Sequence, residues 1–281
     1  MTGPLRTAWG LLIGLLLLTA GDAVAQSFGL GGQSGPLEIT ADQGIEWNRD
    51  QKQYIARGNA RAAQGSTEVR ADELIAYYQA SDDKTVQVAS QIYRIEARGN
   101  VRITTDREQV KGDRAVYDLK KDSIIISGSD VSLKTESELI TATKSLEYDE
   151  ANKIAVARGD ATVVRGDQRV AADLLRAFLV EASEHGKEGK DLVIDRVEAE
   201  GDVRVSTPKD FARGDSGVYY ARNELATLEG NVRITSDGNQ LNGGFAEVNL
   251  ATGVSKLKGS ASGSGQVRGL LIPGSAPSGT Q

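Results

Sequence analysis

The sequence predicts an all-β fold, an open and twisted β-jelly roll made as a solenoid-like stack of antiparallel strands. Apolar and polar residues alternate over long stretches, a glycine-containing motif recurs along the chain, and 32 glycines stand against 5 prolines. Alternation with a period of two is typical of strands that have one buried and one solvated face. Only residues 174–180 show helical spacing, and their place in the repeat favours a strand.

The first repeated element is a strand that passes through glycine and a small polar residue. A clear copy covers residues 95–103, where Ile95, Ala97, Val101 and Ile103 share one phase and polar residues occupy the other. Glycine within a strand marks a bend, a bulge or a close backbone approach. We interpret the repeated glycine as a bend, and a column of such glycines as possible room for a guest molecule.

The second repeated element is an aspartate that follows an apolar residue and precedes an aromatic one. It recurs as Asp72, Asp113, Asp173 and Asp215. A short carboxylate commonly accepts backbone N–H bonds at a turn, whereas catalytic carboxylates form a unique pair. We therefore expect these aspartates to be structural.

The repeats point to an internal duplication. Gly58 and Gly159 are about 100 residues apart, and so are Gly99 and Gly201. We expect a signal peptide at 1–25, a flexible linker at 26–36, one repeat unit at 37–142, a second unit continuous with it at 143–259, and a Gly/Ser-rich tail at 260–281. Polar insertions at 81–84 and 181–191 are expected at a sheet edge.

The first residues have the pattern of an export signal. Arg6 precedes an apolar stretch at 11–19, and Ala23-Val24-Ala25 forms a small-residue cleavage site. We expect cleavage after Ala25 and a secreted mature protein; a retained membrane anchor is the alternative.

Composition excludes several classes of chemistry. The chain has no cysteine, a net charge of −6 and a single histidine, His185, which lies in a polar run. Thiol catalysis and thiolate metal sites are therefore excluded, and serine–histidine catalysis is disfavoured. An acidic chain also disfavours a nucleic-acid partner. We expect a protein that is not an enzyme, with no catalytic residues, no metal site and no cofactor.

Three segments resemble the LptA/OstA family: the opening at 37–42, the strand at 97–104 and the element at 112–118. The resemblance covers about residues 37–273. It implies a periplasmic lipopolysaccharide-transport protein whose inner apolar face holds the acyl chains of lipid A. It further implies a head-to-tail homo-oligomer that bridges an LptC-like inner-membrane protein and an LptD-like outer-membrane protein, and so a role in outer-membrane biogenesis.

Lipid contact is expected from the inward phase of the strands, with a plain closed core as the alternative. The candidates are Ile39, Ile45, Trp47, Ile95, Ala97, Val101, Ile103, Tyr117, Leu119, Val203, Val205, Tyr219, Leu228, Val232 and Ile234. Arginines of the outward phase are expected on a solvated face and are weaker candidates for binding lipid phosphates: Arg102, Arg204 and Arg233.

The first strand, at 37–41, and the last, near 249–257, are expected to be sheet edges that pair with other copies. Two other interpretations remain open. The chain could be an LptC-like or LptD-N-terminal-like component of the same pathway, or a secreted β-solenoid that binds polysaccharide or serves as an adhesin.

Overall fold

The computed structural model describes residues 37–79, 92–182, 192–236, 238–249, 251–252, 254–263 and 265–271. The predicted signal peptide, the linker, His185, the insertion at 81–84 and most of the insertion at 181–191 lie outside these residues. The described chain falls into two compact units, one ending at Val163 and the other beginning at Val164. We refer to them as the amino-terminal and the carboxy-terminal unit.

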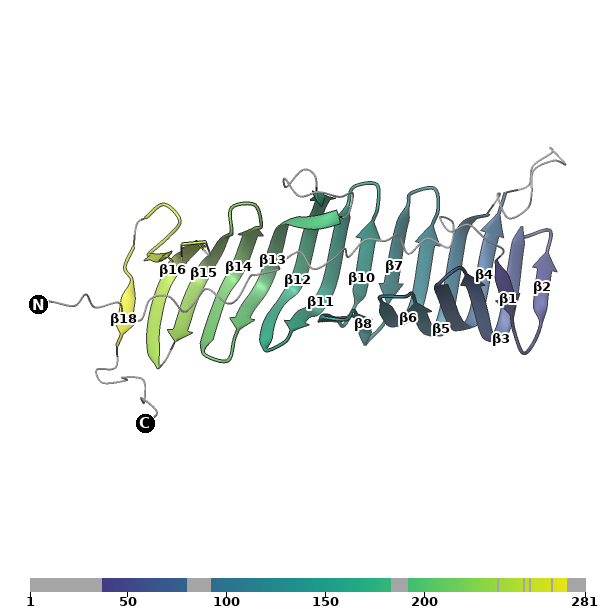
Figure 1. Cartoon of the computed structure of the whole chain (residues 1–281), viewed down its shortest axis with the longest axis horizontal. Helices are drawn as coiled ribbons and strands as arrows, with labels where there is room; N and C mark the ends of the chain where they lie inside the picture. Colours follow the sequence, from purple (N-terminus) through teal and green to yellow (C-terminus); the bar gives the residue numbers. More distant parts are fainter. Residues whose placement is uncertain are drawn as a thin grey trace, which may run out of the picture. The chain divides into compact units, whose positions relative to one another are not determined.

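The amino-terminal unit consists of antiparallel strands that follow one another in sequence (Figure 1). They are β1 (Glu38–Thr40), β2 (Ile45–Asn48), β3 (Gln53–Gln64), β4 (Thr67–Tyr78), β5 (Ile92–Thr104), β6 (Gln109–Asp118), β7 (Ser123–Ser127), β8 (Val131–Lys134), β9 (Glu138–Ala142), β10 (Ser145–Asp149) and β11 (Ile154–Arg165). The last of these, β11, carries the boundary between the units.

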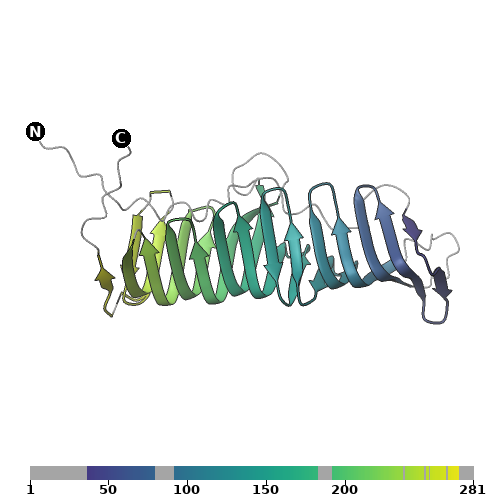
Figure 2. The same ribbon diagram turned by 90° about the horizontal axis from the view of Figure 1, so that it is seen from below.

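The carboxy-terminal unit has the same antiparallel order (Figure 2). Its strands are β12 (Gln168–Glu181), β13 (Leu192–Ser206), β14 (Asp210–Tyr220), β15 (Leu225–Ser236), β16 (Asn239–Asn249), β17 (Val254–Lys258) and β18 (Arg268–Leu270). The predicted all-β fold class is confirmed. Residues 174–180 lie within β12, so their interpretation as strand is also confirmed.

Each long strand contributes to two sheet halves. The beginning of β3 pairs with β2, while its end pairs with β1. The end of β6 pairs with β7 and its beginning pairs with β8. In the amino-terminal unit we call the half that contains β2, β7 and β10 the first sheet half, and the half that contains β1, β8 and β9 the second sheet half. In the carboxy-terminal unit the first sheet half is the one that contains β17, and the second is the one that contains β18.

A bulge separates the two halves in the strand pairs from β3 to β6 and from β12 to β16. The register shifts between Arg98 and Val101, where Gly99 has φ 72° and Asn100 has φ 48°. Two successive left-handed residues turn the strand, and asparagine accepts this conformation more readily than most side chains. Corresponding pairs at Gly58-Asn59, Gly159-Asp160, Gly201-Asp202 and Gly230-Asn231 have the same positive φ values. The predicted bend is therefore present at these glycines.

The repeated aspartates fill the space beside the bulge glycines, which corrects the idea that these glycines admit a guest. A Cβ atom on Gly99 would collide with the carboxylate of Asp72, and Gly201 has the same relation to Asp173. Asp72 accepts hydrogen bonds of 2.9 and 3.1 Å from the side-chain amide of Asn100. The expected backbone N–H donor is found for Asp113, which accepts from the backbone of Ser129 at 3.1 Å.

The sheet edges carry more strands than the sequence indicates. At the amino-terminal end, both β1 and β2 pair with β3. At the other end, β17 and β18 both pair with β16. The strand β18 lies in the segment expected to be a Gly/Ser-rich tail; it is held by backbone pairing with residues 240–242, and its side chains are exposed.

Candidate functional site

An apolar pocket of about 70 Å³ lies inside the carboxy-terminal unit. Its walls come from β12 to β16, and among the residues that the structure describes no charged side chain lines it. The lining residues are Val170, Leu175, Val197, Ala199, Val203, Val205, Ala212, Gly217, Val218, Tyr219, Ala226, Thr227, Leu228, Ile234, Ala246 and Val248.

The two sheet halves both contribute to this pocket, so their inner faces oppose each other. Val205 pairs with Val170 and Ala212 in the second half. Tyr219 pairs with Val197 and Ala226 in the first half. On β13 and β16 the lining residues alternate along the strand, as the period of two predicts, whereas residues 217–219 of β14 and 226–228 of β15 line the pocket consecutively.

Five of the lipid-binding candidates line this pocket together: Val203, Val205, Tyr219, Leu228 and Ile234. Four of them are buried, and Leu228 is half-buried. Val232 is 1% exposed and lies in the core, outside the lining set. Their common location agrees with an apolar binding surface, and their role in lipid contact stays a prediction.

The remaining candidates belong to the amino-terminal unit. Ala97, Val101 and Ile103 are buried. Those that are half-buried are Ile39, Ile95, Tyr117 and Leu119. These residues therefore lie on the inner face or at its margin, and they do not contribute to the pocket of the other unit.

Two candidates, Ile45 and Trp47, are exposed because their strand, β2, is an edge. Ile45 is 53% exposed and Trp47 is 49% exposed. The indole of Trp47 stacks on Tyr54, with ring centroids 5.7 Å apart, and its Nε1 donates a 2.9 Å hydrogen bond to the hydroxyl of Tyr78. This aromatic group closes one side of the inner face at the edge of the unit.

Several pocket residues were missed from the sequence. Val197 and Ala199 alternate in phase with Val203 and Val205, so the period of two identifies them. Leu175 was obscured by the helical spacing of its surroundings, although it is 6% exposed in strand β12. Ala246 and Val248 lie in a copy of the repeat whose motif is weak.

Tyrosine hydroxyls add a few polar groups to the otherwise apolar inner face. Tyr148 pairs with Ile124, which in turn pairs with Tyr117. Burial raises the pKa of Tyr148 to about 12, with a smaller contribution from Glu150, and burial also raises the pKa of Tyr117. Both side chains are therefore neutral at pH 7. The hydroxyl of Tyr148 is buried without a hydrogen-bond partner.

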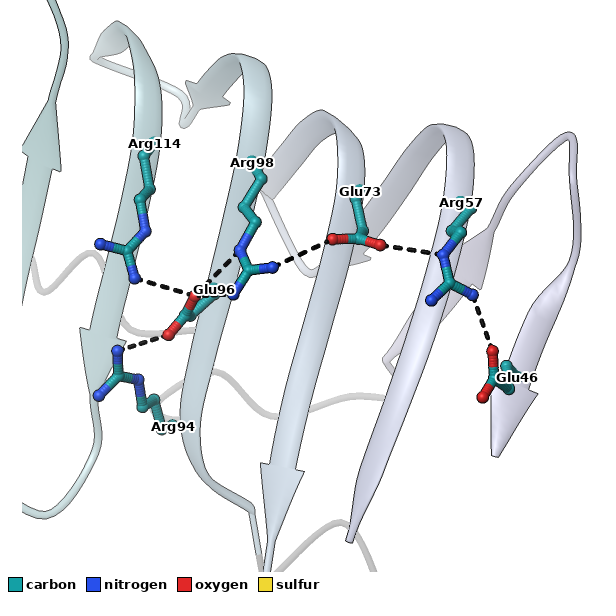
Figure 3. Close-up of polar contacts among 7 residues, drawn as sticks. All are labelled: Glu46, Arg57, Glu73, Arg94, Glu96, Arg98 and Arg114. Atoms are coloured by element: carbon teal, nitrogen blue, oxygen red, sulfur yellow. Dashed lines mark hydrogen bonds and ion pairs between the residues drawn. The ribbon is translucent and has the colours of Figure 1, made fainter. Parts of the chain in front are cut away.

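The outer face of the first sheet half carries a chain of alternating charges across five strands (Figure 3). Glu46 pairs with Arg57 at 2.8 Å, Arg57 with Glu73 at 3.0 Å, and Arg98 with Glu73 at 3.5 Å. Arg98 also pairs with Glu96 at 2.8 Å. We call this set, together with Arg94 and Arg114, the charge ladder.

Glu96 is the centre of this ladder and departs from the predicted pattern. Its alternation places it on a wet face, yet it is only 2% exposed. Arg94 and Arg98 of its own strand and Arg114 of β6 cover it and donate to its carboxylate. Burial alone would raise the pKa of Glu96, but the hydrogen bonds from Arg114, Arg98 and Arg94 outweigh it and lower the pKa to about 2.

Within the described residues no cluster of three or more histidine, cysteine or carboxylate side chains could hold a metal ion. Nor does the described part of the chain include a helix long and apolar enough to span a membrane.

A family model described as LptA/(LptD N-terminal domain) LPS transport protein matches the chain twice, over residues 38–144 and 139–254. A curated protein of Rhizobium meliloti (strain 1021), itself described as uncharacterized, is 26% identical over 98 residues, which are 35% of this chain and 52% of that protein. The chain thus spans about half the length of this curated relative.

A solved structure is also similar. It is LptH, described as the LptA-homologous periplasmic component of the conserved lipopolysaccharide transport device of Pseudomonas aeruginosa. The alignment has a TM-score of 0.40 and 15% sequence identity, and it covers 48% of this chain and 95% of LptH.

Proposed function

Because the chain belongs to the family of LptA and LptD N-terminal domain LPS transport proteins, we propose that it carries lipopolysaccharide through the periplasm between the inner and the outer membrane. The observation that supports this most directly is the apolar pocket enclosed by two opposed sheet faces. We propose that these faces hold the acyl chains of lipid A, and that the protein acts by binding and catalyses no reaction.

The energetics of such binding follow from the lining. Each methylene removed from water contributes about 0.8 kcal/mol, without any directional contact. Acyl chains can therefore bind strongly to a surface made of valine, leucine, alanine and isoleucine side chains. Similar side chains in successive strands give similar affinity at successive positions, which is what movement along the surface requires.

The pocket must widen to accept a whole acyl chain. Its volume of about 70 Å³ is roughly half that of the cavity of about 150 Å³ that admits benzene in another protein. We propose that the two sheet halves separate when lipid enters. The bulges between the halves, with their positive φ values, are the natural place for this change of angle.

We further propose that copies of the chain assemble head to tail. Among the described strands, β2 pairs with β3 alone and β18 with β16 alone, so each has one side without a strand partner there, and each carries an exposed apolar residue, Ile45 and Leu270 respectively. Such an edge can be extended by a strand from another molecule. The same edges would contact an LptC-like protein at the inner membrane and an LptD-like protein at the outer membrane.

A cavity-filling series tests the binding site. Ala199→Leu and Ala226→Leu add apolar volume to the pocket, whereas Ser216→Leu adds the same side chain on the outer face of β14. We expect the two pocket variants to bind purified lipopolysaccharide at least about tenfold more weakly, because they occupy space that the acyl chains need. Ser216→Leu should bind normally, and circular dichroism confirms that all three are folded. Unchanged affinity in both folded pocket variants contradicts the proposal.

A further inference from the structure

Columns of cations cross the outer face of the second sheet half in both units. In the amino-terminal unit, Arg61 pairs with Arg70, Arg70 with Arg102, and Arg102 with Lys111. Strands lie about 4.8 Å apart, so these four residues form a single file of like charges on β3 to β6. We call this file the first cation column.

The carboxy-terminal unit repeats the arrangement. Arg204 pairs with Arg213, and Arg213 with Arg233. The file continues through Asn242, which pairs with both Arg233 and Arg268. We call it the second cation column. The recurrence in both units shows that the arrangement belongs to the repeat and is not an isolated coincidence.

The residues of the columns point away from the core. Arg102 is exposed between Val101 and Ile103, which are 2% and 3% exposed. Arg233 is exposed between Val232 and Ile234, which are 1% and 4% exposed. The cations therefore stand on the outer face of each unit, and those of the second column lie on the opposite side of the sheet from the apolar pocket of the same unit.

The column is incompletely neutralised. Glu68 pairs with Arg61 and Arg70, Glu38 pairs with Arg61 at 3.5 Å, and Asp202 pairs with Arg204 at 3.4 Å. Among the described residues, no ion pair involves the other central members of the columns: Arg102, Lys111 and Arg213. Like charges directly opposite each other destabilise a sheet. The chain has 39 acidic and 33 basic residues, so the succession of basic residues in the columns does not follow from a lack of carboxylates in the sequence.

The charge ladder gives the contrast within the same strands. There, on the first sheet half, the basic residues alternate with Glu46, Glu73 and Glu96 and are paired (Figure 3). Every arginine of the charge ladder thus has a carboxylate partner, whereas Arg102, Lys111 and Arg213 of the columns have no ion-pair partner among the described residues. An external anion would relieve the repulsion in the columns.

We propose that the cation columns bind the phosphate groups of a phosphorylated saccharide, the head group of the carried glycolipid. The identity of the ligand rests on the proposed function, and the site rests on the geometry of the columns. Guanidinium and ammonium groups form charge-assisted hydrogen bonds with phosphate oxygens.

The surroundings of the columns favour a saccharide over other anions. Asp72, Asp113 and Asp215 are exposed two residues further along the same strands as Arg70, Lys111 and Arg213. This acidic strip would repel a broad anionic membrane surface. It suits a sugar, whose hydroxyls can donate to carboxylates while its phosphates bind the adjacent cations. An acidic peptide fits less well, because a peptide that binds as an added strand needs unpaired backbone N–H and C=O groups, and such groups lie at sheet edges.

The test uses a ligand without tails. The probe is lipopolysaccharide that has been chemically deacylated but keeps its phosphates, and titration calorimetry measures its binding to the full chain without the signal peptide. We expect Arg102→Gln/Lys111→Gln and Arg213→Gln/Arg233→Gln each to weaken binding at least about tenfold. The matched control, Lys121→Gln/Lys209→Gln, removes two exposed positive charges at turns and should bind as the unmodified protein does.

Further arms separate the possible outcomes. The same saccharide without phosphates should not bind, and added salt should weaken binding of the phosphorylated form because it screens exposed charges. Without ligand, Arg102→Gln/Lys111→Gln should be at least as stable as the unmodified protein, because it removes opposed like charges. Equal binding by column and control variants overturns the proposal. So does column-dependent binding of phosphatidylglycerol vesicles in the absence of saccharide binding.

The failure of this inference is distinguishable from failure of the proposed function. In one outcome the pocket variants Ala199→Leu and Ala226→Leu bind intact lipopolysaccharide normally, while the column variants no longer bind the deacylated saccharide. This outcome supports the phosphate site at the columns and contradicts the acyl-chain site in the pocket. In the other outcome the pocket variants no longer bind the intact lipid, while the column variants still bind the deacylated saccharide. This outcome supports the acyl-chain site and contradicts the phosphate site.

Discussion

The carboxylate of Asp72 occupies the place that a side chain on Gly99 would need. A Cβ atom on Gly99 would collide with the Oδ2 atom of Asp72, and the same carboxylate accepts two hydrogen bonds from Asn100. Glycine, its small polar successor and the aspartate of the neighbouring strand therefore form one structural unit. The same unit recurs at Asp215, Gly230 and Asn231, whereas Gln43 packs beside the bend glycine Gly58.

Replacement of the glycine tests this unit. Gly99→Ala should lower the free energy of unfolding by about 1–3 kcal/mol, because it adds a collision to an unfavourable backbone conformation. Gly44→Ala is the matched control, since Gly44 has φ 100° and nothing within 4 Å of its added carbon. It should cost only about 1 kcal/mol, from the backbone alone. Denaturant unfolding measures both, and equal losses would show that contact with Asp72 is unimportant.

The buried carboxylate of the charge ladder can be neutralised without change of shape. Glu96→Gln leaves Arg94, Arg98 and Arg114 without their common counter-charge, and we expect the free energy of unfolding to fall by about 1–3 kcal/mol. Glu198→Gln is the comparison, because Glu198 also has two arginine partners but its side chain is 25% exposed. Chemical unfolding should show a smaller loss there; a loss as large as that of Glu96→Gln would contradict the importance of burial.

The lowered pKa of Glu96 also determines how the stability of the fold changes with pH. The pKa of Glu96 is lowered from 4.5 to about 2 in the folded protein. Its charged form therefore stabilises the fold above pH 4.5, and this contribution is lost as the pH falls from 4.5 towards 2. Thermal unfolding across this range should show a steeper loss for the unmodified protein than for Glu96→Gln. Parallel curves for the two proteins would argue against a strongly lowered pKa.

The sequence allows the strands and their inward faces to be predicted, but it does not allow the charge ladder to be predicted. Alternation along a strand is a local property, so it identified Val203, Val205 and Ile234 as inward residues without knowledge of their neighbours. The burial of Glu96 depends on Arg114, which comes from the next strand and reaches it only in the folded register. Likewise, the cation columns arise from pairing between strands. The alternation identified Arg102 as an outward residue and a weaker candidate for lipid phosphates, but it could not place Arg70 and Lys111 beside it.

Association through the sheet edges can be distinguished from nonspecific association of exposed apolar side chains. Ile45→Lys on β2 and Leu270→Lys on β18 place a charge on an edge strand, and we expect each to weaken end-to-end association. Ile125→Lys is the control, because Ile125 is 45% exposed but its strand, β7, pairs with β6 and β10 on its two sides. Size-exclusion chromatography with light scattering measures the assemblies. If Ile125→Lys reduces them as much as the edge variants do, association depends on exposed apolar surface in general.

Site-specific photo-crosslinking to lipopolysaccharide tests the central claim, that alternate side chains of the strands face the acyl chains. A photoreactive residue replaces either member of two adjacent pairs: Leu228 and Glu229 on β15, and Ile124 and Ile125 on β7. Leu228 lines the pocket and Ile124 is 5% exposed, whereas Glu229 and Ile125 lie on the outer face. We expect crosslinks to the acyl chains from Leu228 and Ile124 and none from Glu229 and Ile125. Crosslinks of equal yield from both members of each pair, or from the outer members alone, would contradict the account.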